Sequence, residues 1–250
     1  TSANPHDGSS AHSNMAVRFS GEAVTDLFNS ERAVLQFSGA SQPAIDVLPA
    51  FSGESTEKLQ ILTESKIKVA VLDNIRLAGA GDRLDLMMFY LADREIIEAL
   101  KDAHRRGVVL RVLLDPNKDA FGREKNGIPN RPVGHELHQA GVDVRWCDTH
   151  GEQCHSKTLL IHYGDGTSRL LTGSANFTRR NLQDFNLETD VQILAPRQSP
   201  VIREAEALFA LQWNNTGARV FSAAYEKYRD DARWKYWLYR FMEASGMSTF

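Results

Sequence analysis

Apolar runs and helical stripes alternate through the middle of the chain. Leu84 to Leu91 is almost continuously apolar, as in a strand buried on both faces, and Val108 to Leu114 repeats this pattern. Between them Asp93 can cap a helix that stops at Gly107, and one face of this helix is apolar: Ile96, Ile97, Leu100 and Ala103. This β-α-β order predicts an α/β fold with a mixed, largely parallel central sheet flanked by helices.

The same patterns predict elements on both sides of this unit. Helices are expected at residues 21–29, 67–75, 136–140 and 200–213. Strands are expected at 15–19, 33–37, 142–146, 155–161, 169–172 and 187–194. Residues 38–57 and 115–132 are rich in Gly, Pro and polar residues and read as loops.

Chemistry concentrates in three short segments between residues 155 and 188. In an extended strand His155 and Lys157 point the same way, so an imidazole and an ammonium can meet one ligand. An ammonium suits a phosphate oxygen, and imidazole can attack, accept or donate a proton near neutrality. Ser174 and Asn176 follow the next apolar run with neutral hydrogen-bonding groups, and Glu188 comes later. The pattern indicates phosphoryl transfer that needs no metal or other cofactor.

Taken in order, these segments resemble the motif of the phospholipase D superfamily. They read His-Ser-Lys-Thr-Leu-Leu-Ile, then Leu-Leu-Thr-Gly-Ser-Ala-Asn-Phe-Thr, then Asn-Leu-Glu. The resemblance implies a phosphodiesterase or phosphatidyltransferase, cardiolipin-synthase-like, that works through a phosphohistidine. It also implies roles for five residues. Lys157, Asn176 and Ser174 would hold the non-bridging oxygens, Glu188 would orient an imidazole, and His155 would act as general acid and base or as nucleophile.

The chain departs from the family pattern in two ways. His162 stands where the family usually has an Asp, which puts local geometry in doubt more than the reaction. More importantly, the family builds one site from two motifs, and this chain has one, so it resembles the half that carries the second motif. The other would come from an upstream half of the same protein or from a homodimer partner.

The first residues resemble the end of the missing motif. Ser2 and Asn4 look like the tail of a Gly-Ser-x-Asn element and would bind substrate, while Asn14 would stand where the second half has Glu188. The chain would then begin just after the upstream His and Lys. A short disordered leader rich in Ser, Asn and His explains the same residues.

Composition narrows the choice of function only slightly. With 250 residues, 42% hydrophobic and 24% charged, a globular core is expected. The net charge of −3 weighs modestly against a nonspecific nuclease. No apolar run approaches the roughly 20 residues that cross a bilayer, so a cytoplasmic or peripheral membrane location is expected. Cys147 and Cys154 are too few for a disulfide framework, which makes a reducing compartment the default.

Two further segments are candidates for contacts with substrate or membrane. Lys118 and Arg123 lie in the long polar loop after a central strand, where they could meet an anionic head group. For each of them a solvated position is the alternative. Residues 225–241 interleave basic and aromatic side chains, which suits a membrane interface, although packing on the domain is the commoner outcome and is the interpretation we favour.

The sequence therefore divides into three parts. Residues 1–40 are interpreted as the remnant of an upstream phospholipase D-like half, 41–220 as the domain that carries the second motif, and 221–250 as an aromatic and basic helical tail. The expected substrate is a phospholipid or another phosphodiester. A nuclease of the same superfamily and a non-catalytic phosphate-binding half-domain are the alternatives.

Overall fold

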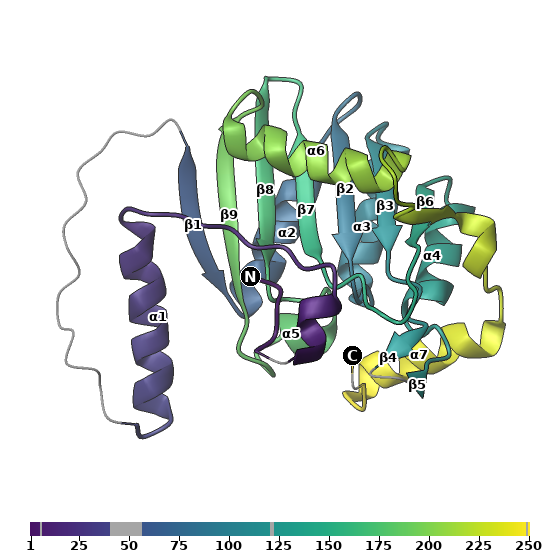
Figure 1. Cartoon of the computed structure of the whole chain (residues 1–250), viewed down its shortest axis with the longest axis horizontal. Helices are drawn as coiled ribbons and strands as arrows, with labels where there is room; N and C mark the ends of the chain where they lie inside the picture. Colours follow the sequence, from purple (N-terminus) through teal and green to yellow (C-terminus); the bar gives the residue numbers. More distant parts are fainter. Residues whose placement is uncertain (6, 41–56, 121–122, 249) are drawn as a thin grey trace.

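The computed structural model describes residues 1–5, 7–40, 57–120, 123–248 and 250. In this part of the chain an eight-stranded sheet has the order β1-β9-β8-β7-β2-β3-β6-β10. Its strands are β1 (Lys58–Thr63), β2 (Arg83–Met88), β3 (Val109–Leu114), β6 (Asp143–Cys147), β7 (Lys157–His162), β8 (Thr167–Gly173), β9 (Thr189–Pro196) and β10 (Ser222–Ala224). Two short strands, β4 (Asp119–Ala120) and β5 (Arg123–Glu124), form a separate hairpin (Figure 1).

The sheet is mixed and mostly antiparallel. Strand β3 pairs in parallel with β2 on one side and β6 on the other. The remaining pairs of neighbours are antiparallel. They are β2 with β7, β7 with β8, β8 with β9, and the edge pairs β9 with β1 and β6 with β10. The α/β class predicted from the sequence is confirmed, but the expectation of a largely parallel sheet was wrong. Only the β2-α3-β3 crossover and its neighbour β6 follow the parallel pattern.

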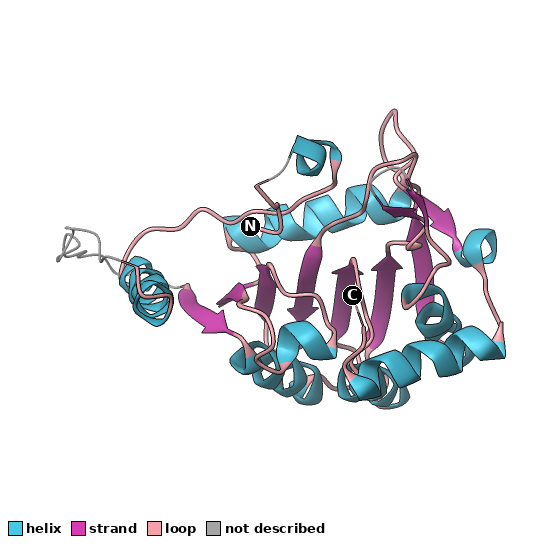
Figure 2. Ribbon diagram, turned by 90° about the horizontal axis from the view of Figure 1, so that it is seen from below, coloured by secondary structure: helices cyan, strands magenta, loops and turns pink. Residues whose placement is uncertain are grey.

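Helices cover both faces of the sheet. They are α1 (Ala23–Phe37), α2 (Ser65–Leu77), α3 (Arg94–Arg105), α4 (Asn130–Gln139), α5 (Arg179–Leu182), α6 (Pro200–Asn214) and α7 (Arg233–Ser245), with two 3-10 turns, η1 (Asp7–Ala11) and η2 (Tyr225–Tyr228). Helix α6 crosses one face, and α2, α3 and α4 lie on the other (Figures 1 and 2). None of the helices in the described ranges combines the length and apolar character needed to cross a bilayer.

Helix α3 shows how the sequence pattern becomes structure. Asp93 accepts hydrogen bonds from the backbone N–H groups of Glu95 and Ile96, at 3.1 and 3.2 Å, and so caps the helix as predicted. The predicted apolar stripe is fully buried: Ile96, Ile97, Leu100 and Ala103. This stripe joins the main core between the sheet and its helices.

The N-terminal expectations were less successful. Residues 15–19 form no strand, and 33–37, predicted as a strand, are the last turns of α1. The apolar residues at short spacing in 33–37 fit a strand and one side of a helix equally well. Residues 15–19 form neither. The predicted loop at 38–57 lies largely outside the described residues, since 41–56 are not among them.

Candidate active site

Strand directions bring the three motif segments to one end of the sheet. Because β7 runs antiparallel to β2, its first residue Lys157 pairs with Met88, the last residue of β2. The end of β8 and the beginning of β9 meet in the same way, where Gly173 pairs with Asp190. The segment that contains His155, the loop after β8 and the start of β9 therefore converge at the carboxyl end of β2.

Phe89 and Tyr90, which follow β2, join these groups. The centroid of the Phe89 ring lies 4.7 Å from the centroid of the His155 ring and 5.1 Å from Lys157 Nζ. The backbone N–H of Tyr90 donates to Asn176 Oδ1 at 3.2 Å. His155, Lys157 and Asn176 thus surround one short segment, as expected if they act on one ligand.

His155 is buried and held in one tautomer. Its Nδ1 lies 3.1 Å from Asn14 Oδ1, while Asn14 Nδ2 donates to the carbonyl oxygens of Ser9 and His12. Since the amide oxygen only accepts, Nδ1 carries the proton and Nε2 keeps its lone pair. Burial, and secondarily the neighbouring Lys157, lower the pKa of His155 to about 3. The imidazole is therefore neutral at neutral pH, as a nucleophile or general base must be.

Lys157 is almost fully buried, and its Nζ donates to the carbonyl oxygen of His155 at 2.9 Å. Burial lowers its pKa to about 7, although the carboxylates of Glu188, Asp190 and Asp115 act in the opposite direction. This ammonium has one short hydrogen bond and can donate others. A bound phosphate would supply acceptors and favour the charged form.

Ser174, in the loop after β8, is hydrogen-bonded to Glu188 and not to His155 or Lys157. The hydroxyl of Ser174 donates to Glu188 Oε2, and the backbone N–H of Thr189 donates to Ser174 Oγ at 3.0 Å. The other carboxylate oxygen of Glu188 accepts from Asn181 Nδ2 in α5. In this arrangement Glu188 orients the motif loop, and the group that meets the His155 imidazole is Asn14.

Two buried carboxyl groups were not recognised in the sequence. Asp190 is fully buried, its Oδ1 accepts from the Ala175 N–H at 3.1 Å, and its Oδ2 has no hydrogen-bond partner. Burial raises its pKa to about 7. Asp115 accepts from the Cys154 N–H at 2.8 Å, and burial raises its pKa to about 6. The position of Asp115 directly after an apolar strand was an available signal, whereas Asp190 lies inside an ordinary strand pattern.

Gly173 fits Asp190 closely. A Cβ atom at Gly173 would stand 2.3 Å from Asp190 Oδ1 and 2.4 Å from the Thr189 carbonyl oxygen, so a larger residue would displace β9. The glycine of the motif is therefore required by the approach of the two strands. The close contact also keeps the buried carboxyl against the loop that carries Ser174 and Asn176.

The N-terminal segment crosses the sheet to reach His155. Ser2 is buried, its Oγ donates to Asn14 Oδ1 at 3.3 Å, and its N–H donates to the Met15 carbonyl oxygen at 2.8 Å. Asn4, also considered a substrate-binding candidate, is exposed and uses its backbone N–H on Ser9 Oγ. The structure thus brings Ser2 next to the site residues and leaves Asn4 at the surface.

The polar loop after β3 lies against the segment that precedes His155. Lys118 Nζ donates to the Thr149 carbonyl oxygen at 3.2 Å and lies 3.6 Å from Asp119 Oδ2. Arg123 is in β5, but its side chain lies outside what the structure describes. His162, at the opposite end of β7, is buried with its Nδ1 2.7 Å from Ser168 Oγ, away from the site.

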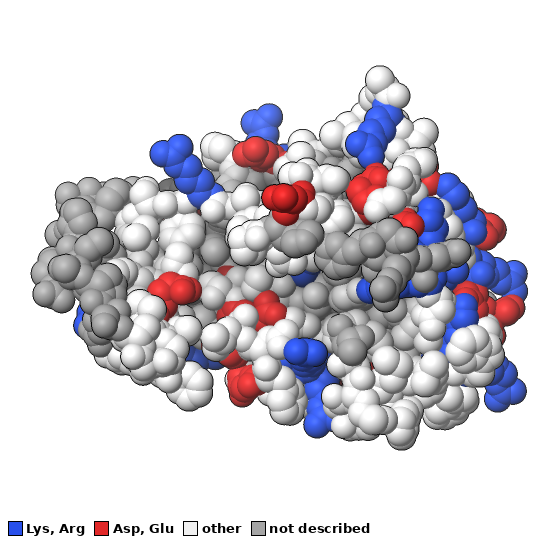
Figure 3. Space-filling model, turned by 60° about the horizontal axis from the view of Figure 1, so that its bottom comes forward, with Lys and Arg blue, Asp and Glu red and all other residues white. Residues whose placement is uncertain are grey.

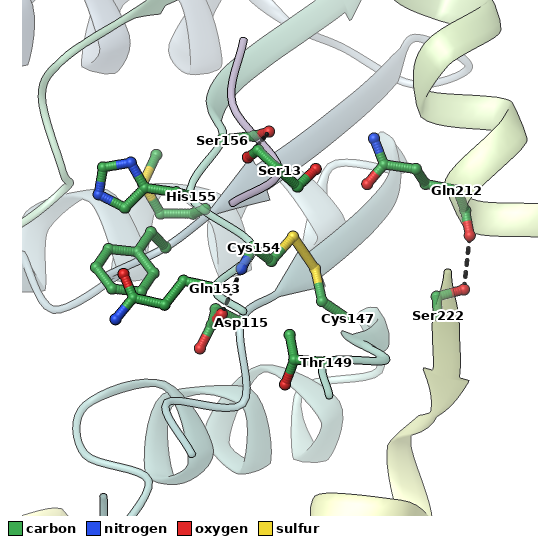
Figure 4. Close-up of a disulfide and its surroundings, with 12 residues drawn as sticks. Ser13, Asp115, Cys147, Thr149, Gln153, Cys154, His155, Ser156, Gln212 and Ser222 are labelled. Atoms are coloured by element: carbon green, nitrogen blue, oxygen red, sulfur yellow. Dashed lines mark hydrogen bonds between the residues drawn. A yellow bond between two sulfur atoms is a disulfide. The ribbon is translucent and has the colours of Figure 1, made fainter. Parts of the chain in front are cut away.

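The two cysteines also lie beside the site. A disulfide joins Cys147, at the end of β6, to Cys154, and Asp115 lies beneath the Cys154 backbone (Figure 4). The sequence suggested two separate thiols in a reducing compartment, so this bond is a correction. It closes the loop that leads directly into His155.

Comparison with known proteins identifies the family. Residues 56–213 match the family described as "Cardiolipin synthase, PLD-like domain". The chain therefore belongs to the phospholipase D superfamily. The match runs from just before β1 to the end of α6 and includes the whole motif.

Individual relatives are more distant. A mitochondrial cardiolipin hydrolase from Danio rerio is 27% identical over 135 residues, which cover 52% of this chain and 54% of the relative. The chain thus spans about half the length of this curated relative.

Two solved structures are similar to this one. Phosphatidylserine synthase from Haemophilus influenzae aligns with a TM-score of 0.54 and 12% identity, over 93% of this chain and 55% of that chain. The phospholipase D family member Nuc from Salmonella typhimurium aligns with a TM-score of 0.49 and 22% identity, over 63% of this chain and 95% of that chain. At these identities the first alignment supports the shared fold alone.

Proposed function

We propose that this chain supplies one half of a phospholipase D-type active site that hydrolyses or transfers a phosphodiester, with phospholipid as the substrate. The main support is the neutral His155 beside Lys157 and Asn176, all gathered around Phe89 and Tyr90. A second motif, from an upstream half or from a partner chain, would complete the site. In this proposal residues 1–40 belong to that other half and 41–220 carry the motif described here.

The proposed reaction has two displacements. One histidine attacks phosphorus through Nε2 and forms a phosphohistidine, while the other gives a proton to the leaving alcohol oxygen. An acceptor oxygen, from water or another alcohol, then loses its proton to the second histidine and displaces the first. Lys157, Asn176 and Ser174 hold the non-bridging oxygens as negative charge shifts onto them.

The resting state of His155 bears on its role. With its pKa near 3, His155 is ready to attack or to accept a proton through Nε2, but Nε2 has no proton to give at neutral pH. The charge of Lys157 lowers the pKa of the His155 imidazole. A bound phosphodiester would add a negative charge next to both groups, and this charge would raise the pKa of the imidazole again. General acid catalysis by His155 therefore requires bound substrate.

An apolar cavity supports a lipid substrate. A cavity of about 360 Å³ adjoins Ser174 between α1 and the β1–β9 edge of the sheet. Its lining is mainly apolar, with two carboxylates and no basic side chain: Thr1, Met15, Ala16, Val17, Phe19, Leu27, Ser30, Glu31, Val34, Ile61, Glu64, Thr172, Gly173, Ser174, Leu187, Thr189 and Val191. Such a surface suits an acyl chain better than a nucleic-acid backbone. The names of the matching family and of the fish relative, which refer to cardiolipin, point the same way.

The test is a phosphodiesterase assay over a range of protein concentrations, with phospholipid vesicles and single-stranded DNA as alternative substrates. We expect lipid turnover that appears on dimerisation or on adding the upstream half, and that is lost in His155→Ala. The matched control is His150→Ala, an exposed histidine that should leave turnover unchanged. Activity that persists in His155→Ala would refute the role of the motif, and DNA cleavage without lipid turnover would refute the substrate.

A further inference from the structure

Helix α7 presents two different faces. Its inner face packs on the domain, where Tyr239 is fully buried and receives a hydrogen bond from Arg94 Nη1 at 3.3 Å. On the opposite face Trp234, Trp237 and Phe241 are 59, 61 and 58% exposed. Their spacing of three and four residues places them in one stripe along the helix. The packing expected for this tail is thus found on one side only.

Large aromatic side chains rarely lie exposed in a row without a partner. We call Trp234, Trp237 and Phe241 the aromatic stripe. Amphipathic rings of this kind settle at the boundary between water and lipid, where part of each ring is buried and the indole N–H stays hydrated. A short helix with such a stripe can lie flat in this boundary.

The charges around the aromatic stripe favour an anionic surface. Arg233 and Arg240 lie along one flank of the stripe, and Arg233 is the only charged residue among the exposed positions of α7. The acidic residue of the helix, Glu243, is turned inward and accepts from the Arg179 N–H at 2.8 Å. In Figure 3 the surface over α7 is largely uncharged, with Lys and Arg side chains, and some Asp and Glu, at its edges. Asp231, which precedes the helix, is exposed and paired with Arg229 at 3.1 Å.

A second group of exposed residues lies at the C-terminal end of α7, where Arg179 of α5 contacts Glu243. Phe185 and Met247 are 63 and 60% exposed, and a small cavity beside α5 is lined by Arg179, Arg180, Phe185, Gly246 and Ser248. Helix α5 begins three residues after Asn176 of the motif loop, so this cavity joins the end of α7 to a helix next to that loop in the chain. The C-terminal Phe250 also packs near Tyr90, with the ring centroids 6.0 Å apart.

From these observations we propose that the aromatic stripe of α7 docks the protein on a lipid bilayer that contains anionic lipids. The stripe enters the interfacial region, and Arg233, Arg240 and Arg180 contact lipid phosphates. Docking through α7 would bring the motif loop close to the head groups. The inference deepens the proposed lipid function, but membrane binding is measured without turnover, so either proposal can fail alone.

Vesicle co-sedimentation tests this surface, with vesicles of phosphatidylcholine alone and of phosphatidylcholine mixed with phosphatidylglycerol. We expect the full chain to bind the mixed vesicles more tightly than the neutral ones. The double variant Trp237→Ser, Phe241→Ser should weaken binding to the mixed vesicles by about tenfold or more. The matched control is Phe37→Ser in α1, which removes an apolar residue that is 93% exposed elsewhere on the molecule.

Tryptophan fluorescence gives a second, direct measurement. Of the four tryptophans, Trp146 and Trp213 are buried, so a change of environment on vesicle binding reports Trp234 and Trp237. We expect a blue shift with mixed vesicles, and loss of this shift in Trp234→Phe, Trp237→Phe. Circular dichroism of each variant checks that the fold is intact.

Three results would overturn the proposal. The wild-type chain could fail to bind either kind of vesicle, or the double serine variant could bind as tightly as wild type. The double variant could also turn an oligomeric wild-type protein that ignores vesicles into a monomer, which would show that the aromatic stripe is a protein interface.

Discussion

His155 and Lys157 are adjacent titratable groups that share one buried environment. Burial favours the neutral form of both, while three carboxyl groups partly support the charge on Lys157. The two side chains therefore respond to pH in different ranges. His155 gains a proton only in acid, whereas Lys157 gains or loses its proton near neutrality, where a phosphodiesterase would work.

Anion binding at the site should depend on the protonation of Lys157. Its pKa of about 7 means that the ammonium is present below pH 7 and lost above it. The neighbouring Asp190, with a pKa also near 7, gains negative charge over the same range. We therefore expect the affinity for sulfate, which keeps its charge between pH 6 and 8, to fall about tenfold across that interval. Isothermal titration calorimetry at several pH values measures this affinity.

Two variants separate Lys157 from general charge effects. Lys157→Met should bind sulfate weakly and with little change from pH 6 to 8, whereas Lys66→Met, at an exposed position of α2, should behave as wild type. A flat wild-type profile, or an unchanged slope in Lys157→Met, would contradict the assignment.

At the scale of elements, the capped helix α3 offers a test of local stability. Asp93→Ala removes the acceptor for the Glu95 and Ile96 N–H groups and the partner of Lys68, whose Nζ lies 2.9 Å from Asp93 Oδ2. We expect the free energy of unfolding to fall by about 1 to 2 kcal/mol. Urea denaturation measures this change.

The control lies at the other end of the same helix. Asp102→Ala removes an exposed carboxylate paired with Arg105, and should change the stability by less than about 0.5 kcal/mol. Equal effects of the two substitutions would show that Asp93 does not act as a cap.

Helices and strands were predicted correctly from the sequence where several local signals agreed. Helix α3 was predicted in full, because its cap, its apolar stripe and the terminating Gly107 agree. Residues 33–37 were misread, since five residues with several apolar side chains fit either a strand or the last turns of α1. The direction of β7 could not be read from its own residues, because strand pairing depends on contacts between distant segments.

In the candidate site, too, the residues that belong to a local motif could be predicted, and those that act through distant contacts could not. His155, Lys157, Ser174, Asn176 and Glu188 could be named because they occur in order in a recognisable motif. Asn14 was placed by its resemblance to the position of Glu188, but its contact with the His155 imidazole depends on how the N-terminal segment meets the motif in space. The role of the buried Asp190 likewise depends on how β8 and β9 meet. Nothing in the immediate sequence of Asp190 distinguishes it from an ordinary polar residue of a strand.

At the scale of the whole molecule, a buried ion pair links the sheet to α6. Asp85 in β2 accepts two hydrogen bonds from Arg111 in β3, at 2.7 and 2.8 Å, and Arg111 stacks 4.7 Å from the centroid of the Phe209 ring in α6. The guanidinium therefore contacts both the sheet and the helix that covers it. This is a connection between layers rather than within one element.

Breaking this pair should cost far more than breaking one at the surface. Arg111→Met leaves Asp85 buried with less compensation, and we expect a loss of about 3 to 5 kcal/mol in the free energy of unfolding, measured in urea. The double variant Asp85→Leu, Arg111→Met should recover much of this loss. Arg105→Met, which breaks an exposed pair, should cost under about 1 kcal/mol. A similar small loss in Arg111→Met would argue against the ion pair as a connection between the layers.

The succession of β7, β8 and β9 as adjacent antiparallel strands has an evolutionary consequence. Every motif side chain comes from one contiguous stretch, and its strands pair through local connections. Copying this stretch of gene would copy the whole motif already in register. A two-motif enzyme can therefore arise from a single ancestor by duplication, after which each copy is free to specialise.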